Sequence, residues 1–380
     1  TLQERLSLLH GTPESNTGVP GFYTGNTAPV PRLGIPALKM QDASSGFRPA
    51  QEGEDGTTTC WPSLLALAAT WDAALVEEVA ATVAREFRGK GANVLLGPGI
   101  NVHRTARGGR NFEYLSGEDP MLGAVLGSAF VQGVQSQNVM AVIKHFAFNE
   151  QDTLRTSYNV EVDERTAWEQ YYAPFIAAVE AGAGAVMCAY NKVHGQWACE
   201  NEQLLNVDLR QKMGFQGFVM SDWNAAHSTG AVQRGLDMEM PMGKFFTEPL
   251  LRTLPPVPKN FEAATSDAAH RILASIYKLR LDGHPGCEPP CRLERRSNQR
   301  APGHLALARR AAASSVVLLK NSANILPFDP ERVHKIALIG PAANASDLHF
   351  NTPAVQWVGT PYAGGGSGHV AAPKAVTPLE

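Results

Sequence analysis

The sequence predicts an α/β fold built on a parallel sheet, either a closed barrel or an open doubly wound sheet. Two observations support this class. Short apolar runs alternate with amphipathic stretches over the first ~280 residues. Apolar residues make up 44% of the 380 residues and charged residues 18%, which is typical of a globular protein.

The individual elements follow from the apolar spacing. Leu75, Val79, Val83 and Phe87 recur every four residues, and Asp72 can cap the helix they form. Similar patterns predict helices at 73–90, 120–137, 164–180, 201–213 and 265–281. Apolar runs predict strands at 36–40, 93–96, 140–143, 185–189, 218–220 and 236–240.

The composition changes at residue 284. Residues 284–304 contain prolines, two cysteines and several basic residues, which is typical of an inter-domain linker. A helix at 305–313 and strands at 316–320 and 335–339 are then expected to begin a second α/β domain. The predicted organisation is therefore a barrel domain at 1–283, a linker at 284–304, and an incomplete second domain at 305–380.

Charge and motifs exclude several functional classes. The 33 basic and 36 acidic residues give a net charge of −3, so nothing favours nucleic acid or an anionic membrane as a partner. No apolar run reaches the roughly 18–20 residues needed to span a bilayer. No glycine-rich phosphate-binding motif follows a strand, so no nucleotide cofactor is expected, and we predict no cofactor of any kind.

The cysteines and the first residues bear on the compartment. Cys188 and Cys199 could form one disulfide and Cys287 and Cys291 another, or the thiols could be free. The sequence starts at TLQERLSLLHG, which lacks the features of a signal peptide, so we expect a processed chain or a fragment. One glycosylation sequon begins at Asn344, and we expect an extracellular or secretory-pathway location.

Polar residues follow each of the six strands predicted in the first domain. In a β/α barrel the carboxyl ends of the strands meet at one face, where the active site forms. Carboxylates, cations and aromatic rings together suit the binding of a sugar, and two carboxylates flanking a glycosidic bond can hydrolyse it. The polar residues at these ends are Asp42, Asn101, Arg104, Lys144, His145, Tyr190, Asn191, Ser221, Asp222, Trp223 and Glu239.

Two rival chemistries fit less well. The histidines show no spacing typical of a metal site, so no metal is predicted. Lys144 could act as a Schiff-base nucleophile, but the adjacent His145 and the Ser-Asp-Trp strand end fit that mechanism poorly.

Several long motifs resemble family 3 glycoside hydrolases of the β-glucosidase type. They include LGIPALKMQDASSGFR, GRNFEYLSGEDP, KHFAFNEQD, VMCAYNKVHG and GFVMSDW, and the resemblance runs nearly from end to end. It implies a TIM-like (β/α)8 barrel followed by the start of an α/β sandwich domain, to which SVVLLKNSANILPF and KIALIGP are similar.

The resemblance also implies a role for each site residue. Asp222 matches the catalytic nucleophile, and nearby cations are expected to lower its pKa. Asp42 matches a ligand of the sugar hydroxyls, and Trp223 matches an aromatic residue on the aglycone side. The other positions that match the first sugar subsite are Arg48, Arg110, Lys144, His145, Arg155, Met187 and Tyr190.

The sequence departs from the family pattern in two ways. Asp42-Ala43-Ser44 replaces the usual Asp-Gly-Pro, which could change the loop that presents Asp42. No residue matches the glutamate that serves as general acid/base on the second domain, so none is nominated.

The predicted function is that of a retaining, exo-acting β-glucosidase acting on a small oligosaccharide or glucoside. A β-xylosidase or related β-glycosidase is one alternative. A truncated sugar-binding protein with little turnover is another.

Overall fold

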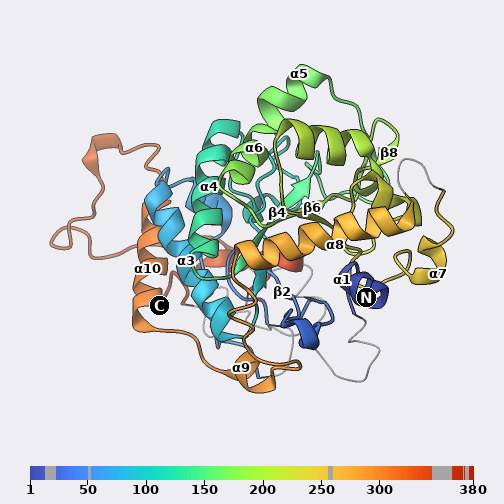
Figure 1. Ribbon diagram of the computed structural model, residues 1–380. Helices are drawn as coiled ribbons and strands as arrows, with labels where there is room; N and C mark the ends of the chain where they lie inside the picture. Colours follow the sequence, from blue (N-terminus) through green and yellow to red (C-terminus); the bar gives the residue numbers. More distant parts are fainter. Residues whose placement is uncertain (13–22, 50–52, 256–259, 345–361, 371, 373–375) are drawn as a thin grey trace.

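A curled sheet of short strands forms the centre of the molecule (Figure 1). The computed structural model describes residues 1–12, 23–49, 53–255, 260–344, 362–370, 372 and 376–380. The sheet order is β1-β2-β3-β4-β6-β9, and all neighbours are parallel except β1 and β2. Its strands are β1 (Gly25–Asn26), β2 (Lys39–Gln41), β3 (Val94–Leu95), β4 (Met140–Phe146), β6 (Ala185–Cys188) and β9 (Phe218–Ser221).

Two segments without regular strand structure continue the sheet back to β1. Met238 forms a parallel bridge with Met220 of β9, and Glu239 bridges in turn to His10. The Thr12 amide then donates to the Asn26 carbonyl of β1 at 2.9 Å. The predicted strand at 236–240 is therefore present only as bridges, but these bridges close the curled sheet into a ring.

Helices cover the outside of the sheet, as expected for a β/α barrel. Helices α3 (Ala73–Gly89) and α4 (Pro120–Gln135) pack closely side by side, and α4 also contacts α6 (Ala173–Glu180) (Figure 1). Asp72 and Asp119 cap α3 and α4 through their side chains. The remaining helices of this region are α1 (Leu2–Leu8), α2 (Leu64–Ala68), α5 (Glu164–Thr166), α7 (Glu248–Leu251) and α8 (Phe261–Lys278).

Two predicted helices differ in detail from the expectation. The helix at 164–180 is interrupted by a π-helical segment at Ala167–Tyr171, just before Pro174. Proline lacks an amide hydrogen and crowds the preceding turn, which explains the interruption. The helix at 201–213 is π-helical over Gln203–Lys212. A small separate sheet, β5 (Asn159–Val160), β7 (Lys192–Val193) and β8 (Gln196–Trp197), lies in the loops after β4 and β6.

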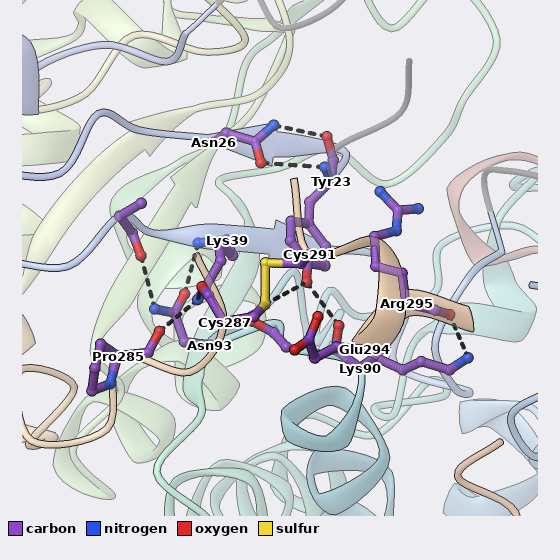
Figure 2. The surroundings of a disulfide bond; sticks show 12 residues. Tyr23, Asn26, Lys39, Lys90, Asn93, Pro285, Cys287, Cys291, Glu294 and Arg295 are labelled. Atoms are coloured by element: carbon purple, nitrogen blue, oxygen red, sulfur yellow. Dashed lines mark hydrogen bonds between the residues drawn. A yellow bond between two sulfur atoms is a disulfide. The ribbon is translucent and has the colours of Figure 1, made fainter. Parts of the chain in front are cut away.

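The segment at 284–300 is folded against the barrel and contains one of two disulfides, Cys287–Cys291 (Figure 2). The Lys39 ammonium donates to the carbonyls of Pro285 and Cys287 at 2.5 and 2.7 Å. Lys90 donates to the Arg295 carbonyl at 2.6 Å, near the end of the short helix α9 (Arg292–Arg296). Burial lowers the pKa of both lysines to about 8. The segment predicted as a linker is thus held against the barrel by the buried ammonium groups of Lys39 and Lys90.

The second disulfide, Cys188–Cys199, joins the end of β6 to the turn after β8. Both cysteine pairs considered from the sequence are therefore bonded, and Cys60 remains free.

Residues after 300 follow the prediction only in part. Helix α10 (Pro302–Ser314) forms and packs beside α3, with Leu307 and Ala311 buried (Figure 1). The strands predicted at 316–320 and 335–339 are wrong, because both segments are irregular and exposed, and Leu319 and Ile339 are more than 90% exposed. A strand needs a partner for its backbone groups, and none of the described residues pairs with these segments.

Among the described residues, no helix is long and apolar enough to cross a membrane.

We predict that the Arg295–Glu54 ion pair fixes the 284–300 segment. Both side chains are 1% exposed, and Arg295 donates two hydrogen bonds to the carboxylate at 2.5 and 2.9 Å. Glu54→Gln should lower the free energy of unfolding by about 3–5 kcal/mol because it removes the carboxylate charge that pairs with a buried guanidinium. Urea denaturation measures this loss.

The matched control is the exposed ion pair between Arg310 and Glu78. Glu78→Gln should cost no more than about 1 kcal/mol. Equal losses in the two variants would contradict the structural role given to the buried pair.

Candidate active site

A cavity of about 360 Å³ opens at the carboxyl ends of the sheet strands. This volume lies within the range of small-molecule sites, about 300–1,000 Å³. All ten residues predicted from the sequence line it: Asp42, Arg48, Arg110, Lys144, His145, Arg155, Met187, Tyr190, Asp222 and Trp223. The chain therefore brings together groups that are up to 181 residues apart in sequence (Asp42 to Trp223).

Asp222 follows β9 directly, and its backbone is fixed by the neighbouring strand. Its amide donates to the Cys188 carbonyl at 3.2 Å, where β6 ends. One carboxylate oxygen, Oδ1, accepts the Trp223 amide at 2.7 Å. The other, Oδ2, lies 3.4 Å from Nε2 of His145. The carboxylate is thus presented to the cavity at a strand end whose backbone is held by hydrogen bonds.

Asp42 lies among cations on another side of the cavity. Its oxygens lie 3.6 Å from Arg48 Nη1 and 4.0 Å from Lys144 Nζ. The loop after it closes in a tight turn, with reciprocal backbone hydrogen bonds between Ala43 and Gly46 of 2.8 and 3.2 Å. Gly46 has a φ of +131° and approaches Thr59 closely, so the turn depends on this glycine. The loop therefore presents Asp42 without the Gly-Pro of the family pattern.

A chain of alternating charges forms the wall beside Asp222. Arg110 is bonded to buried Glu113 and also approaches Asp152, with 3.9 Å between Nη1 and Oδ1. Arg155 pairs with the same Asp152 oxygen at 2.9 Å, and its guanidinium lies 4.7 Å from the centre of the Tyr190 ring. Asp152, which the sequence analysis did not select, thus connects the two arginines.

Two aromatic side chains, Tyr190 and Trp223, also line the cavity. The Tyr190 hydroxyl donates to the Trp223 carbonyl at 2.9 Å. The Trp223 indole donates to the Thr24 carbonyl at 3.2 Å, and Gln41 in turn accepts from the Thr24 amide. These bonds fix the indole where a sugar ring could stack on it.

A segment near the other end of the chain completes the cavity. Gly365, Gly366 and Ser367 line it, and Ser367 Oγ accepts a 2.7 Å hydrogen bond from Arg110 Nη2. Gly364 and Gly368 pack so closely on Phe112 that a side chain at either position would clash. No motif or apolar pattern selected this glycine-rich stretch from the sequence, so its contact with the site was missed.

Other strand-end residues serve the scaffold instead of the cavity. Asn101 binds the backbone of His145, and Arg104 binds the Tyr171 hydroxyl. Glu239 accepts the amides of Lys244, Phe245 and Phe246, and Asn191 donates to the Ala147 carbonyl. Their position at strand ends was therefore not by itself a sign of contact with a ligand.

Burial shifts the pKa values of two carboxyl groups in the cavity. It raises the pKa of Asp222, whereas the sequence analysis expected a lowered value. Arg110, Arg155 and the Trp223 amide act in the opposite direction but do not outweigh the loss of water. Burial likewise raises the pKa of Asp42 against the charges of Lys144 and Arg48. The cations thus oppose the effect of burial on both carboxyl groups without cancelling it.

In the part of the chain that the structure describes, no group of three or more His, Cys, Asp or Glu side chains is placed to hold a metal ion. The polar chemistry of the cavity therefore consists of carboxylates, cations, an imidazole and aromatic rings.

Comparison with known proteins identifies the family. Residues 23–274 match the model of the glycosyl hydrolase family 3 N terminal domain, and residues 316–380 match that of the C-terminal domain. The chain belongs to glycosyl hydrolase family 3. A β-glucosidase of Rhizobium radiobacter is 38% identical over the whole chain, which covers 43% of that protein.

Solved structures of the same family share the fold. The β-D-glucoside glucohydrolase of Trichoderma reesei aligns over 100% of this chain and 52% of its own, with a TM-score of 0.87 and 33% identity. A Kluyveromyces marxianus β-glucosidase in complex with glucose aligns over 100% of this chain and 43% of its own, with a TM-score of 0.84 and 31% identity. The chain thus spans about half the length of these family 3 relatives or less.

We predict that Arg155 lowers the pKa of Asp222. Arg155→Met removes one of the positive charges that oppose the effect of burial, so the pKa of Asp222 should rise further. Carboxyl ¹³C NMR of the aspartate-labelled protein measures this titration, and Asp222→Asn assigns the signal.

Exposed Arg165, which pairs with Glu169, provides the control. Arg165→Met should leave the Asp222 titration where it is. An unchanged or lowered pKa of Asp222 in Arg155→Met would contradict the electrostatic account of the site.

Proposed function

We propose that this protein is a retaining, exo-acting β-glucosidase that removes terminal β-linked glucose from small oligosaccharides or glucosides. The single observation that carries the proposal is the placement of Asp222 on a strand end, inside a cavity lined by all the predicted sugar ligands. Family membership and the glucose-bound relatives support it.

The proposed reaction has two steps. An oxygen of Asp222 attacks the anomeric carbon of the sugar, and the bond from that carbon to the aglycone oxygen breaks. The leaving oxygen takes a proton from a general acid, and a glycosyl ester of Asp222 remains. Water then attacks the same carbon, loses a proton to the same acid/base, and releases the sugar with its original configuration.

The other residues bind and orient the sugar in this proposal. Asp42, Arg48 and Lys144 form a cluster suited to neighbouring hydroxyls, which can accept from and donate to these groups. Trp223 at the rim suits the aglycone side. This cluster favours a hexose, because Asp42 can bind a hydroxyl that a pentose such as xylose lacks. Hydrolysis of xylosides is the alternative specificity.

The general acid is not assigned to a residue of the cavity. Besides Asp222, the carboxyl groups that line it are Asp42 and Asp152, and both are paired with cations. The family resemblance assigns the role to a glutamate of the second domain, and no residue of this sequence matches it.

The proposal predicts covalent labelling of Asp222. An activated 2-deoxy-2-fluoro-β-glucoside has a leaving group that needs little acid assistance, and its fluorine slows the second step, so the glycosyl ester should accumulate. Peptide mass spectrometry should locate the sugar on Asp222. Asp222→Asn should prevent labelling and lower kcat by about 10⁴–10⁶-fold.

Two further measurements test the proposal. One is the labelling of a control variant, and the other compares substrates with a good and a poor leaving group. Asp152→Asn serves as the matched control in the same cavity and should keep the label on Asp222. Labelling of another residue would overturn the assignment of the nucleophile. Glucose binding without labelling, and without hydrolysis of either a dinitrophenyl glucoside or cellobiose, would favour the sugar-binding alternative.

A further inference from the structure

Tyr114 lies behind His145, on the side away from Asp222. Its hydroxyl is 2.7 Å from Nδ1 of His145, while Nε2 of the same ring faces the Asp222 carboxylate at 3.4 Å. Tyr114 is 5% exposed and His145 only 1%. Tyr114 does not line the cavity, but it is hydrogen-bonded to the imidazole of a residue that does.

The environment of the imidazole favours its neutral form. Burial lowers its pKa well below the ordinary value, and the charges of Arg110, Lys144 and Arg155 act in the same direction. Among the residues that the structure describes, Asp222 has the one carboxylate within ion-pair distance of the ring. A neutral imidazole carries one N–H group and one acceptor nitrogen, so its tautomer decides which atom faces the cavity.

The two neighbours of the ring favour the same tautomer. With the hydrogen on Nε2, the ring donates toward Asp222 and Nδ1 accepts the Tyr114 hydroxyl. With the hydrogen on Nδ1, a lone pair of Nε2 would face the carboxylate. The Tyr114 hydroxyl hydrogen would then have no acceptor among the described residues, and a buried unsatisfied donor is costly.

The backbone of His145 is also held in place by hydrogen bonds. The Asn101 side chain accepts the His145 amide at 2.7 Å and donates to the His145 carbonyl at 3.1 Å. The same Asn101 amide group also donates to Glu150 at 3.1 Å. Asn101 thus fixes the main chain of His145, and Tyr114 acts on its side chain.

We propose that Tyr114 is a positioning residue that holds His145 in the Nε2–H tautomer, so that the imidazole presents a hydrogen-bond donor to Asp222 and to a bound sugar hydroxyl. The effect on the sugar rests on the proposed glucosidase function. The tautomer of His145 does not depend on that function, and it can be measured in the protein without a bound sugar.

Long-range ¹H–¹⁵N NMR of the intact, histidine-labelled protein tests the proposal. His145 should give the signal pattern of a neutral Nε2–H ring between pH 5 and 8, and His145→Gln assigns it. Tyr114→Phe removes only the hydroxyl and should shift His145 toward the Nδ1–H tautomer or a mixture. It should also lower kcat/KM for 4-nitrophenyl β-glucoside about tenfold, as expected for one displaced hydrogen bond.

Tyr172→Phe is the matched control. Tyr172 is also a buried tyrosine with a bonded hydroxyl, which donates to Asp208 at 3.1 Å and does not line the cavity. This variant should lose stability without changing the His145 signal or kcat/KM.

Two results would overturn the proposal. One is an Nδ1–H or protonated His145 in the unaltered protein, which can be seen even if Tyr114→Phe fails to fold. The other is an unchanged tautomer in folded Tyr114→Phe. A protein that turns over no glucoside would instead refute the proposed function and leave the tautomer measurement to decide this inference.

Discussion

The burial of Asp222 against positive charges is the constraint on which the rest of the site depends. A carboxylate removed from water is unstable unless cations and N–H donors replace the lost hydration. Here Arg110, Arg155, Lys144 and the Trp223 amide do so, yet the pKa of Asp222 still lies above its usual value. Burial thus favours the neutral carboxyl group of Asp222, whereas the surrounding positive charges favour its anion.

The cations around Asp222 are themselves held in place by other residues, so the environment of Asp222 also depends on contacts farther from it. Arg110 is held by Glu113 and Ser367, and Arg155 by Asp152. Ser367 belongs to a segment more than 250 residues from Arg110 in sequence. The environment of Asp222 thus depends on the barrel strands together with a segment in the region that matches the second domain.

The sequence predicted the site better than it predicted the secondary structure. The ten residues selected through the family resemblance share one cavity. Six of them follow predicted strands, and the carboxyl ends of strands in a β/α barrel converge even where strand boundaries shift by a few residues. The strands at 316–320 and 335–339 could not be judged from local pattern, because a strand exists only when a partner pairs with it. Asp152, Tyr114 and Ser367 were missed for a related reason. Their roles come from contacts with Arg155, His145 and Arg110, and pattern alone does not reveal contacts.

A crystal structure of the protein with bound glucose tests the central claim most directly. The account predicts glucose in the cavity, with its anomeric carbon about 3–3.5 Å from an Asp222 oxygen and its hydroxyls on Asp42 and Lys144. Glucose bound elsewhere, or oriented with its anomeric carbon toward Asp42, would contradict the assignment of Asp222 as the nucleophile.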